Sequence, residues 1–229
     1  MLSRKWALSD LSAASVVLSV IIVLLGQTLE PPEIACVKNM SSWSPAFSAV
    51  DSSWQMFRNG FSEKSIYRGS PTPAIEDAWS DILQQHPILV PESDTGLDPR
   101  DSTHEFALVK SADGQIPAYL EVFRNMGCLN LLRQHTYREE YDYSSIDAFQ
   151  GTEAEIMRRV DACTQRLREV LMCVGDATPY LIMLTPEKAQ TESPDFNTLH
   201  YCRDFDGIVQ WTRENQIDDV NFEGYSRYI

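Results

Sequence analysis

The chain is poor in basic residues, with 19 Lys and Arg against 33 Asp and Glu, so its formal net charge is −14. Nucleic acids and anionic membrane surfaces bind proteins through clustered Lys and Arg. The negative net charge therefore argues against either as the main partner. The sequence also lacks a Gly-x-Ser-x-Gly turn, a glycine-rich phosphate loop and a Cys-x-x-Cys pair. Nucleophile-elbow hydrolases, nucleotide-binding loops and thioredoxin-like redox sites are therefore not indicated, and no aspartate or serine nucleophile set stands out.

Apolar residues make up 43% and aromatic residues 10% of the 229 residues, which is typical of a globular protein with a real core. Residues 11–29 contain no charge, Arg4 and Lys5 precede them, and Glu30 follows. Nineteen uncharged residues just suffice to span a bilayer as a helix, and the basic flank is expected to stay cytosolic. We therefore predict a single-pass membrane protein whose following domain lies in the secretory-pathway lumen. A cleaved signal peptide is the alternative, although no good cleavage site follows.

This interpretation divides the chain into four parts: a cytosolic N-terminus at 1–10, an anchor at 11–29, a Ser/Pro-rich stem at 30–65 and one lumenal domain at 66–229. The stem contains Cys36 and the triplet Asn39-Met-Ser41, a candidate glycosylation sequon.

Periodicity predicts an α+β domain that is mainly helical. Thr72 and Pro73 are typical of a helix start, and an apolar stripe follows at helical spacing up to Leu83. The further predicted elements are a β-hairpin at 106–110 and 119–123, helices at about 125–137 and 153–172, a strand at 180–184 and a short helical or irregular element at 205–212.

Two similar pentapeptides, Arg124-Asn-Met-Gly-Cys128 and Arg159-Val-Asp-Ala-Cys163, each open a helical segment that contains arginine. They resemble the paired His-x-x-His-Cys motifs of the UstYa-like family, ustiloxin-type oxidases of fungal mycotoxin biosynthesis. Further blocks that resemble the family follow in the right order, at Tyr67–Trp79, Glu121–Asn130, Cys163–Pro179, and His200–Asp206 with Trp211.

The resemblance implies redox chemistry on peptide-like natural products, namely oxidative cyclisation, hydroxylation, halogenation or desaturation. Two residues three apart share a helix face, so two such helices can present four imidazoles to one transition metal. Here Arg124, Gly127, Arg159 and Ala162 stand at the histidine positions. Glycine and alanine have no donor atom and arginine keeps its proton, so we predict no metal and no cofactor at this motif.

A substitute metal site from His135, His200 and acidic residues is an alternative, against ordinary surface or structural roles for both histidines. The two motif arginines are predicted to line the former metal cavity and to hold a carboxylate or polarise a carbonyl. The alternative is that Arg124 and Arg159 are both solvated.

Four cysteines of the domain allow three pairings in an oxidising lumen, or they stay reduced. Because both motif cysteines are present without the histidines, a disulfide fits them better than metal ligation. We predict Cys128–Cys163 together with Cys173–Cys202.

The resemblance predicts a tailoring protein in a fungal pathway to a peptide-derived mycotoxin or related secondary metabolite, whose divergent site performs cyclisation, oxidation or another modification such as acyl transfer. The alternative is a non-catalytic subunit that pairs with a motif-complete relative, and a plain membrane-anchored binding protein is a third interpretation. Expected partners are a peptide-like or small-molecule intermediate and a related family member, with no nucleic acid.

Overall fold

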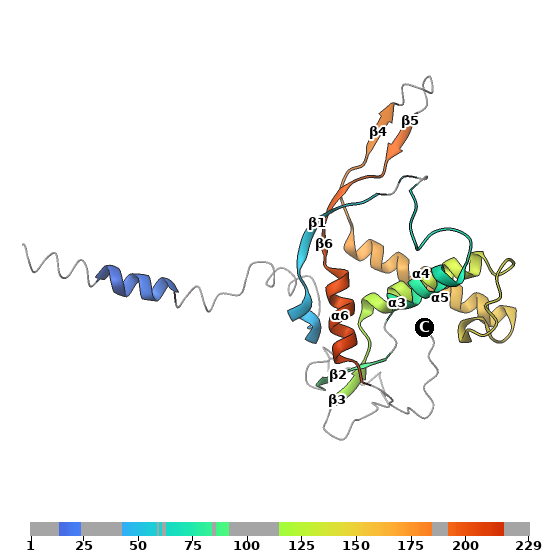
Figure 1. Ribbon diagram of the computed structural model, residues 1–229, viewed down its shortest axis with the longest axis horizontal. Coiled ribbons are helices and arrows are strands. Elements are labelled where there is room, and N and C mark those ends of the chain that lie inside the picture. Colours follow the sequence, from blue (N-terminus) through green and yellow to red (C-terminus); the bar gives the residue numbers. More distant parts are fainter. Residues whose placement is uncertain are drawn as a thin grey trace, which may run out of the picture. The chain divides into compact units, whose positions relative to one another are not determined.

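The computed structural model describes residues 14–23, 43–58, 60, 63–83, 86–91, 115–184 and 192–217. The chain divides into two compact units, Met1–Phe47 and Ser48–Ile229. The first unit contains a helix at residues 14–23. The second contains the strands and helices from β1 to α6 (Figure 1).

The predicted membrane anchor at 11–29 is wrong. Among the residues whose structure is described, no helix combines the length and the apolar character that a bilayer crossing requires. The lack of charge in this stretch was therefore not sufficient to predict a membrane-spanning helix, and the single-pass localisation inferred from it is also wrong. Cys36 and Asn39 lie outside the described residues.

The described part of the chain is mixed α/β, with five α-helices and three two-stranded antiparallel sheets. The expected class, a mainly helical α+β domain behind an anchor, is corrected accordingly. Short strands account for the difference, because two of the three sheets, β1–β6 and β2–β3, form between segments far apart in sequence. The labelled elements are η1 (Pro45–Ala49), β1 (Ser52–Met56), α3 (Pro73–Asp81), β2 (Ile88–Pro91), β3 (Gln115–Ala118), α4 (Glu121–Thr136), η3 (Asp147–Phe149), α5 (Glu153–Val174), β4 (Leu181–Leu184), β5 (Glu192–Asp195), β6 (Leu199–Arg203) and α6 (Phe205–Asn215).

Helix α3 starts where the sequence predicts. The Thr72 hydroxyl accepts a hydrogen bond from the Ile75 amide at 3.3 Å, and Pro73 occupies the first turn. The helix ends at Asp81, so the predicted stripe is shorter than expected, and Trp79 is its buried residue.

The predicted hairpin at 106–110 and 119–123 is not the pairing observed. β3 pairs with β2 instead, with Val90 opposite Ile116, and residues 106–110 lie outside the described part. Residues 121–123 form the first turn of α4 rather than a strand. Phe123 is buried there against Ile208 and Val209 of α6, so tertiary packing overrides the β propensity of this stretch.

Helices α4 and α5 pack antiparallel. Glu121 at the start of α4 forms an ion pair with Arg166 late in α5, while Arg138, just after α4, pairs with Glu153 at the start of α5. Thr152 caps α5 in a capping box with Glu155, and Gly175 ends it in the left-handed conformation, with φ 53°. This helix pair holds one of the three core clusters, which contains Cys128, Leu131, Ala148 and Cys163.

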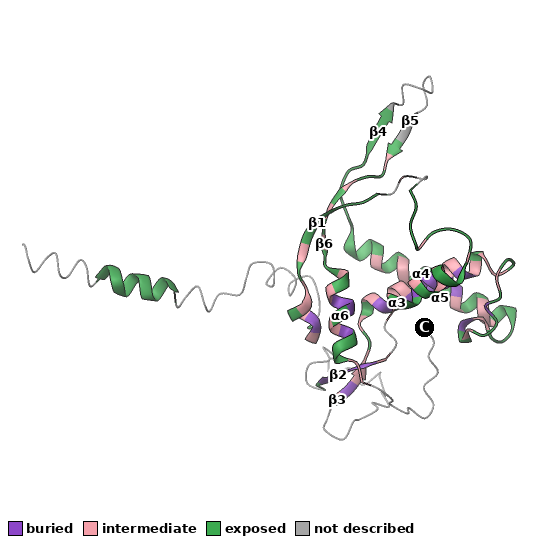
Figure 2. Ribbon diagram, viewed as in Figure 1, coloured by how far each residue is buried: buried purple, intermediate pink, exposed green. Residues whose placement is uncertain are grey.

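Helix α6 joins the other two clusters. Ile208 and Val209 pack against Phe123, and Trp211 packs against the cluster formed by β2 and β3. β6, which precedes α6, pairs with β1, and β4 pairs with β5. Figure 2 shows that the β4–β5 pair and the C-terminal end of α5 are largely exposed.

Candidate functional site

The two motif cysteines form a disulfide between α4 and α5, as predicted, with their Cα atoms 4.9 Å apart. The second predicted pair is wrong, because Cys173 and Cys202 are both free. Cys173 is exposed near the end of α5, whereas Cys202 is held on β6 opposite Ser53 of β1.

The antiparallel packing separates the two arginines that the sequence placed in one cavity. Arg124 lies four residues before Cys128 on α4, and Arg159 lies four residues before Cys163 on α5. Because the helices run in opposite directions from the disulfide, these steps lead to opposite sides of it. At 1.5 Å per residue, the two positions are roughly 12 Å apart along the helix axes. Only a parallel pair of helices would bring them to one level.

The surroundings of the four motif positions differ. Arg124 and Ala162 are exposed, whereas Gly127 is buried. Arg159 is half-buried and its guanidinium donates to the carbonyl oxygens of Ala148 and Gln150, at 3.1 and 2.7 Å. Arg159 thus fastens the segment around η3 to α5. A catalytic role for either arginine stays a prediction, but the structure does not bring the two together.

Arg159→Ala is expected to lower the free energy of unfolding by about 1–2 kcal/mol, because two carbonyls lose a charged donor. Arg124→Ala, a matched substitution at an exposed position, is expected to change it by less than about 0.5 kcal/mol. Urea unfolding of both variants measures this difference. Product formation measured alongside tests the sequence-based hypothesis, which predicts its loss in both variants; an equal, large destabilisation of both would contradict the arrangement described here.

A second group of polar side chains lies between α3 and α4. The Glu76 carboxylate accepts two hydrogen bonds from Arg133, at 2.9 and 2.6 Å, one from Gln134 at 3.3 Å and one from the Tyr143 hydroxyl at 3.0 Å. The Arg133 guanidinium also lies 5.3 Å from the centre of the Trp79 ring. We call these five residues the Glu76 network.

The pKa values in the Glu76 network follow from burial and from these contacts. Burial raises the pKa of Glu76, but hydrogen bonds from Arg133, Gln134 and Tyr143 outweigh it, so that the pKa lies below its ordinary value. Burial, followed by the neighbouring Glu76 carboxylate, raises the pKa of Tyr143 to about 12. The network therefore holds an ionised carboxylate and a neutral phenol near pH 7.

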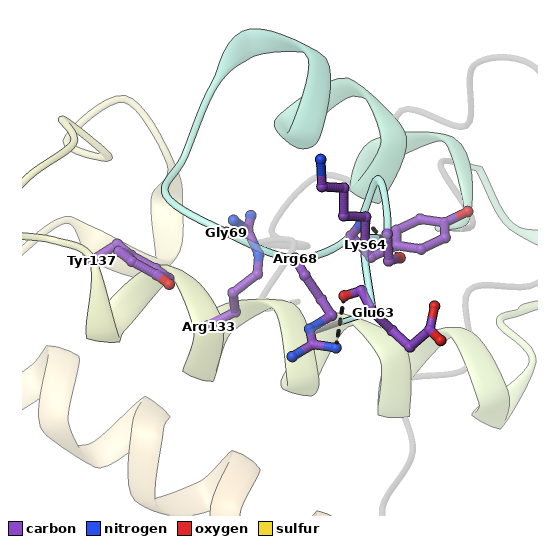
Figure 3. Close-up of a pocket in the computed structure, with 8 residues that line it drawn as sticks. Glu63, Lys64, Arg68, Gly69, Arg133 and Tyr137 are labelled. Atoms are coloured by element: carbon purple, nitrogen blue, oxygen red, sulfur yellow. Dashed lines mark hydrogen bonds between the residues drawn. The ribbon is translucent and has the colours of Figure 1, made fainter. Parts of the chain in front are cut away.

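A cavity of about 700 Å³ lies beside this network, between α4 and the segment 63–69. Figure 3 shows Arg133 of α4 and Tyr137, the residue that follows α4, on one side and Lys64 and Arg68 of the segment on the other. Arg68 donates to the carbonyl oxygens of Gly60 and Glu63, both at 3.1 Å, which fixes the segment. The volume falls within the range of ordinary small-molecule sites.

The two histidines considered as substitute ligands lie in different surroundings. His135 is half-buried on α4, and its Nε2 has no hydrogen-bond partner among the described atoms. His200 on β6 contacts a carboxylate and a hydroxyl: its Nδ1 lies 2.9 Å from Asp176 Oδ2, and its Nε2 lies 2.5 Å from Thr198 Oγ1. Sequence reasoning missed this group. Asp176 and His200 belong to two of the family-like blocks, but nothing in their spacing predicts that they meet.

A family model described as "Mycotoxin biosynthesis protein UstYa" matches residues 3–215 of the chain. The chain belongs to the UstYa family. Relatives include the UstYa family oxidase phomYc of Diaporthe leptostromiformis, 33% identical over 94% of this chain and 86% of the relative. The transacylase cctO of Talaromyces islandicus is 30% identical over 80% of this chain and 63% of its own length. No solved structure matches the chain. Tailoring in a fungal secondary-metabolite pathway to a mycotoxin is therefore the function class of this UstYa protein.

The residues at the paired motif do not fit a four-imidazole metal site in this UstYa protein. Gly127 and Ala162 carry no ligand atom, and the Arg159 guanidinium donates to backbone carbonyls. Among the described residues, no three His, Cys, Asp or Glu side chains gather in a way that could hold a metal ion.

Proposed function

We propose that this UstYa protein is an enzyme that modifies a peptide-derived intermediate at a site other than the paired motif. The observation that carries the proposal is the state of that motif. Its two helices are present and joined by Cys128–Cys163, while the four positions around the disulfide offer no ligand set. The motif then serves as a structural link, and the relatives' printed activities, oxidase and transacylase, indicate that the family supports more than one reaction.

The cavity beside the Glu76 network supports a peptide-like substrate. Lys64, Arg68 and Arg133 line it together with one acidic residue, Glu63, and the rings of Tyr67 and Tyr137. Positive side chains attract a carboxylate, and aromatic rings offer flat apolar surface to a peptide side chain. A small peptide with a free carboxyl end has this chemistry.

Deletion of the gene in its source fungus tests the proposal. We expect the final metabolite to fall at least about tenfold and an unmodified intermediate to accumulate, since the missing step supplies all later ones. Mass spectrometry of culture extracts measures both, and re-introducing the wild-type gene is the control. An unchanged metabolite profile would show that the chain performs no required step.

A second candidate function is that of a subunit that binds a motif-complete member of the family. The β4–β5 pair favours it, because Tyr180, Leu181, Ile182 and Met183 are 47–64% exposed in consecutive positions. Contiguous exposed apolar surface of this kind marks interaction sites. If this role is the right one, Ile182→Asp abolishes co-purification with the relative and product formation together; in an enzyme acting alone, it leaves product formation intact.

A further inference from the structure

His200 bridges a hydroxyl and a carboxylate through its two ring nitrogens. The Thr198 Oγ1 atom lies 2.5 Å from Nε2, and the Asp176 Oδ2 atom lies 2.9 Å from Nδ1. A hydroxyl, an imidazole and a carboxylate in this order form the arrangement that activates a nucleophile: a base within reach of the hydroxyl, and a third group that orients the base.

Several elements hold the imidazole of His200 in place. The side chain is 14% exposed and stacks on the Phe57 ring, with the ring centres 4.0 Å apart. The Phe57 amide donates to the Thr198 carbonyl at 2.9 Å, which ties the segment before β6 to the end of β1. Gln55 lies opposite His200 in the β1–β6 register. The ring and the threonine therefore sit on a paired strand end rather than on a free loop.

The carboxylate belongs to Asp176, which is the first residue after Gly175, the C-terminal cap of α5. The Asp176 Oδ1 atom accepts from the Thr178 amide at 2.8 Å, which leaves Oδ2 for His200. Hydrogen bonds from Thr178, and then the neighbouring His200, lower the pKa of Asp176. An ionised carboxylate favours the imidazole tautomer with its proton on Nδ1, so that the lone pair on Nε2 faces Thr198.

A cavity opens on the threonine side of this group. It has a volume of about 290 Å³, and Thr178, Leu181, Asn197, Thr198 and Leu199 line it. Pro179 and Asp195 complete the lining, so apolar side chains, hydroxyl and amide groups and one carboxylate surround the space. Thr198 thus contacts a base through its hydroxyl and also lines a space open to a substrate.

The geometry points to an acyl-transfer site at Thr198, His200 and Asp176 that accepts an activated acyl group, an ester or a thioester, and passes it to an amine or hydroxyl. In the first half-reaction, Thr198 Oγ1 bonds to the acyl carbon and gives its proton to His200 Nε2. The bond to the leaving alcohol or thiol breaks, and this group takes that proton. In the second, the acceptor loses its proton to Nε2, attacks the Thr198 ester and releases the threonine. The ester oxygen then recovers the proton from His200. No electrons are gained or lost, so no oxidant or reductant is required.

This inference rests on the proposed enzyme function and names its reaction class. The probe is p-nitrophenyl acetate, a simple activated ester, applied to the purified full-length chain. We expect release of p-nitrophenolate and an acetyl group that peptide mapping places on Thr198. Thr198→Val is expected to lower the release at least about 100-fold, and Asp176→Asn to lower it by a similar factor, since the tautomer changes. Thr198→Ser is expected to retain activity and to carry the acetyl group on residue 198, and a merely structural hydroxyl does not become acetylated.

The control is Thr164→Val, the same substitution on α5. Thr164 is exposed, and its hydroxyl donates to the carbonyl oxygen of Val160. The control substitution is expected to leave the rate unchanged, and thermal unfolding of every variant checks the fold. Acetylation of Cys202 instead of Thr198, no acetylation at all, or an unchanged rate in Thr198→Val would overturn the inference. If a Thr198→Val gene restores the metabolite in the deletion strain, the acyl-transfer site is refuted and the proposed function is not. If deletion of the wild-type gene leaves the metabolite unchanged, the proposed function itself is refuted.

Discussion

Glu76→Ala is expected to lower the free energy of unfolding by about 3–5 kcal/mol, the range for removing one partner of a buried ion pair. The side chains of Arg133 and Glu76 are only 11% and 18% exposed. Without the carboxylate, the Arg133 guanidinium stays mostly buried and loses two charged hydrogen bonds. Gln134 and Tyr143 lose their acceptor as well. Four hydrogen bonds end on this carboxylate, so its removal is expected to cost as much as the loss of one partner of a fully buried ion pair.

Urea unfolding at pH 7 measures this change, with Glu153→Ala as the control. Glu153 also pairs with an arginine, Arg138 at 2.7 Å, but its side chain is 62% exposed. Solvent screens such a pair, so its loss is expected to cost less than about 1 kcal/mol. Similar costs for Glu76→Ala and Glu153→Ala would show that the Glu76 network does not stabilise the fold as its burial indicates.

The same carboxylate gives stability a pH dependence with a defined sign. The folded-state pKa of Glu76 lies below its ordinary value of 4.5. Its contribution is thus fully present well above pH 4.5, and it is lost as the pH falls from about that value through the lower folded-state pKa. Glu76→Gln is expected to flatten the acid side of the stability profile, so the two proteins differ less at low pH than at pH 7.

Removal of the Cys128–Cys163 disulfide is expected to cost about 3–4 kcal/mol. The bond closes a loop with a sequence separation of 35 residues, and a loop of this length restricts the unfolded chain by about that amount. Both half-cystines are almost fully buried in the α4–α5 cluster, so Cys128→Ala with Cys163→Ala also removes sulfur atoms from the core. The midpoint of urea unfolding, with and without a reducing agent, measures the effect.

Cys173→Ser is the matched control for the disulfide, because this thiol is free and exposed. It is expected to leave the midpoint unchanged under both conditions. A wild-type midpoint that does not respond to reduction would contradict a stabilising role for the bond. In that case α4 and α5 would be held by their apolar contacts, by the Arg166 contacts to Asn125 and Glu121, and by the ion pair of Arg138 with Glu153.

Local signals in the sequence predicted the start of α3. Thr72 and Pro73 begin this helix as expected, because capping depends on residues close together in the chain. The elements that the sequence predicted wrongly are those whose structure depends on contacts with residues far away in the chain. Phe123 is helical because α6 packs on it, and β3 pairs with β2 rather than with the nearby segment predicted for it.

In the candidate sites, too, some features could be predicted from the sequence, and those that depend on how distant elements pack could not. The Cys128–Cys163 bond could be anticipated because both motif cysteines are present without the motif histidines. The direction in which α4 and α5 run was not predicted, and that direction separates Arg124 from Arg159. The contact of Asp176 with His200 depends on the end of α5 reaching a strand that pairs with β1, and no spacing within the sequence encodes that pairing.

Helix α5 also fixes the direction in which the residue after its C-terminal cap, Asp176, points away from the helix axis. The disulfide fixes the rotation of the helix at Cys163, and Gly175 ends it twelve positions later, so Asp176 leaves at one defined azimuth. One residue inserted between them turns that azimuth by about 100°, and a whole-turn insertion restores the angle but advances the carboxylate by about 5.4 Å. The number of residues between Cys163 and Asp176 therefore decides whether the carboxylate reaches His200, as directly as the identity of residue 176 does.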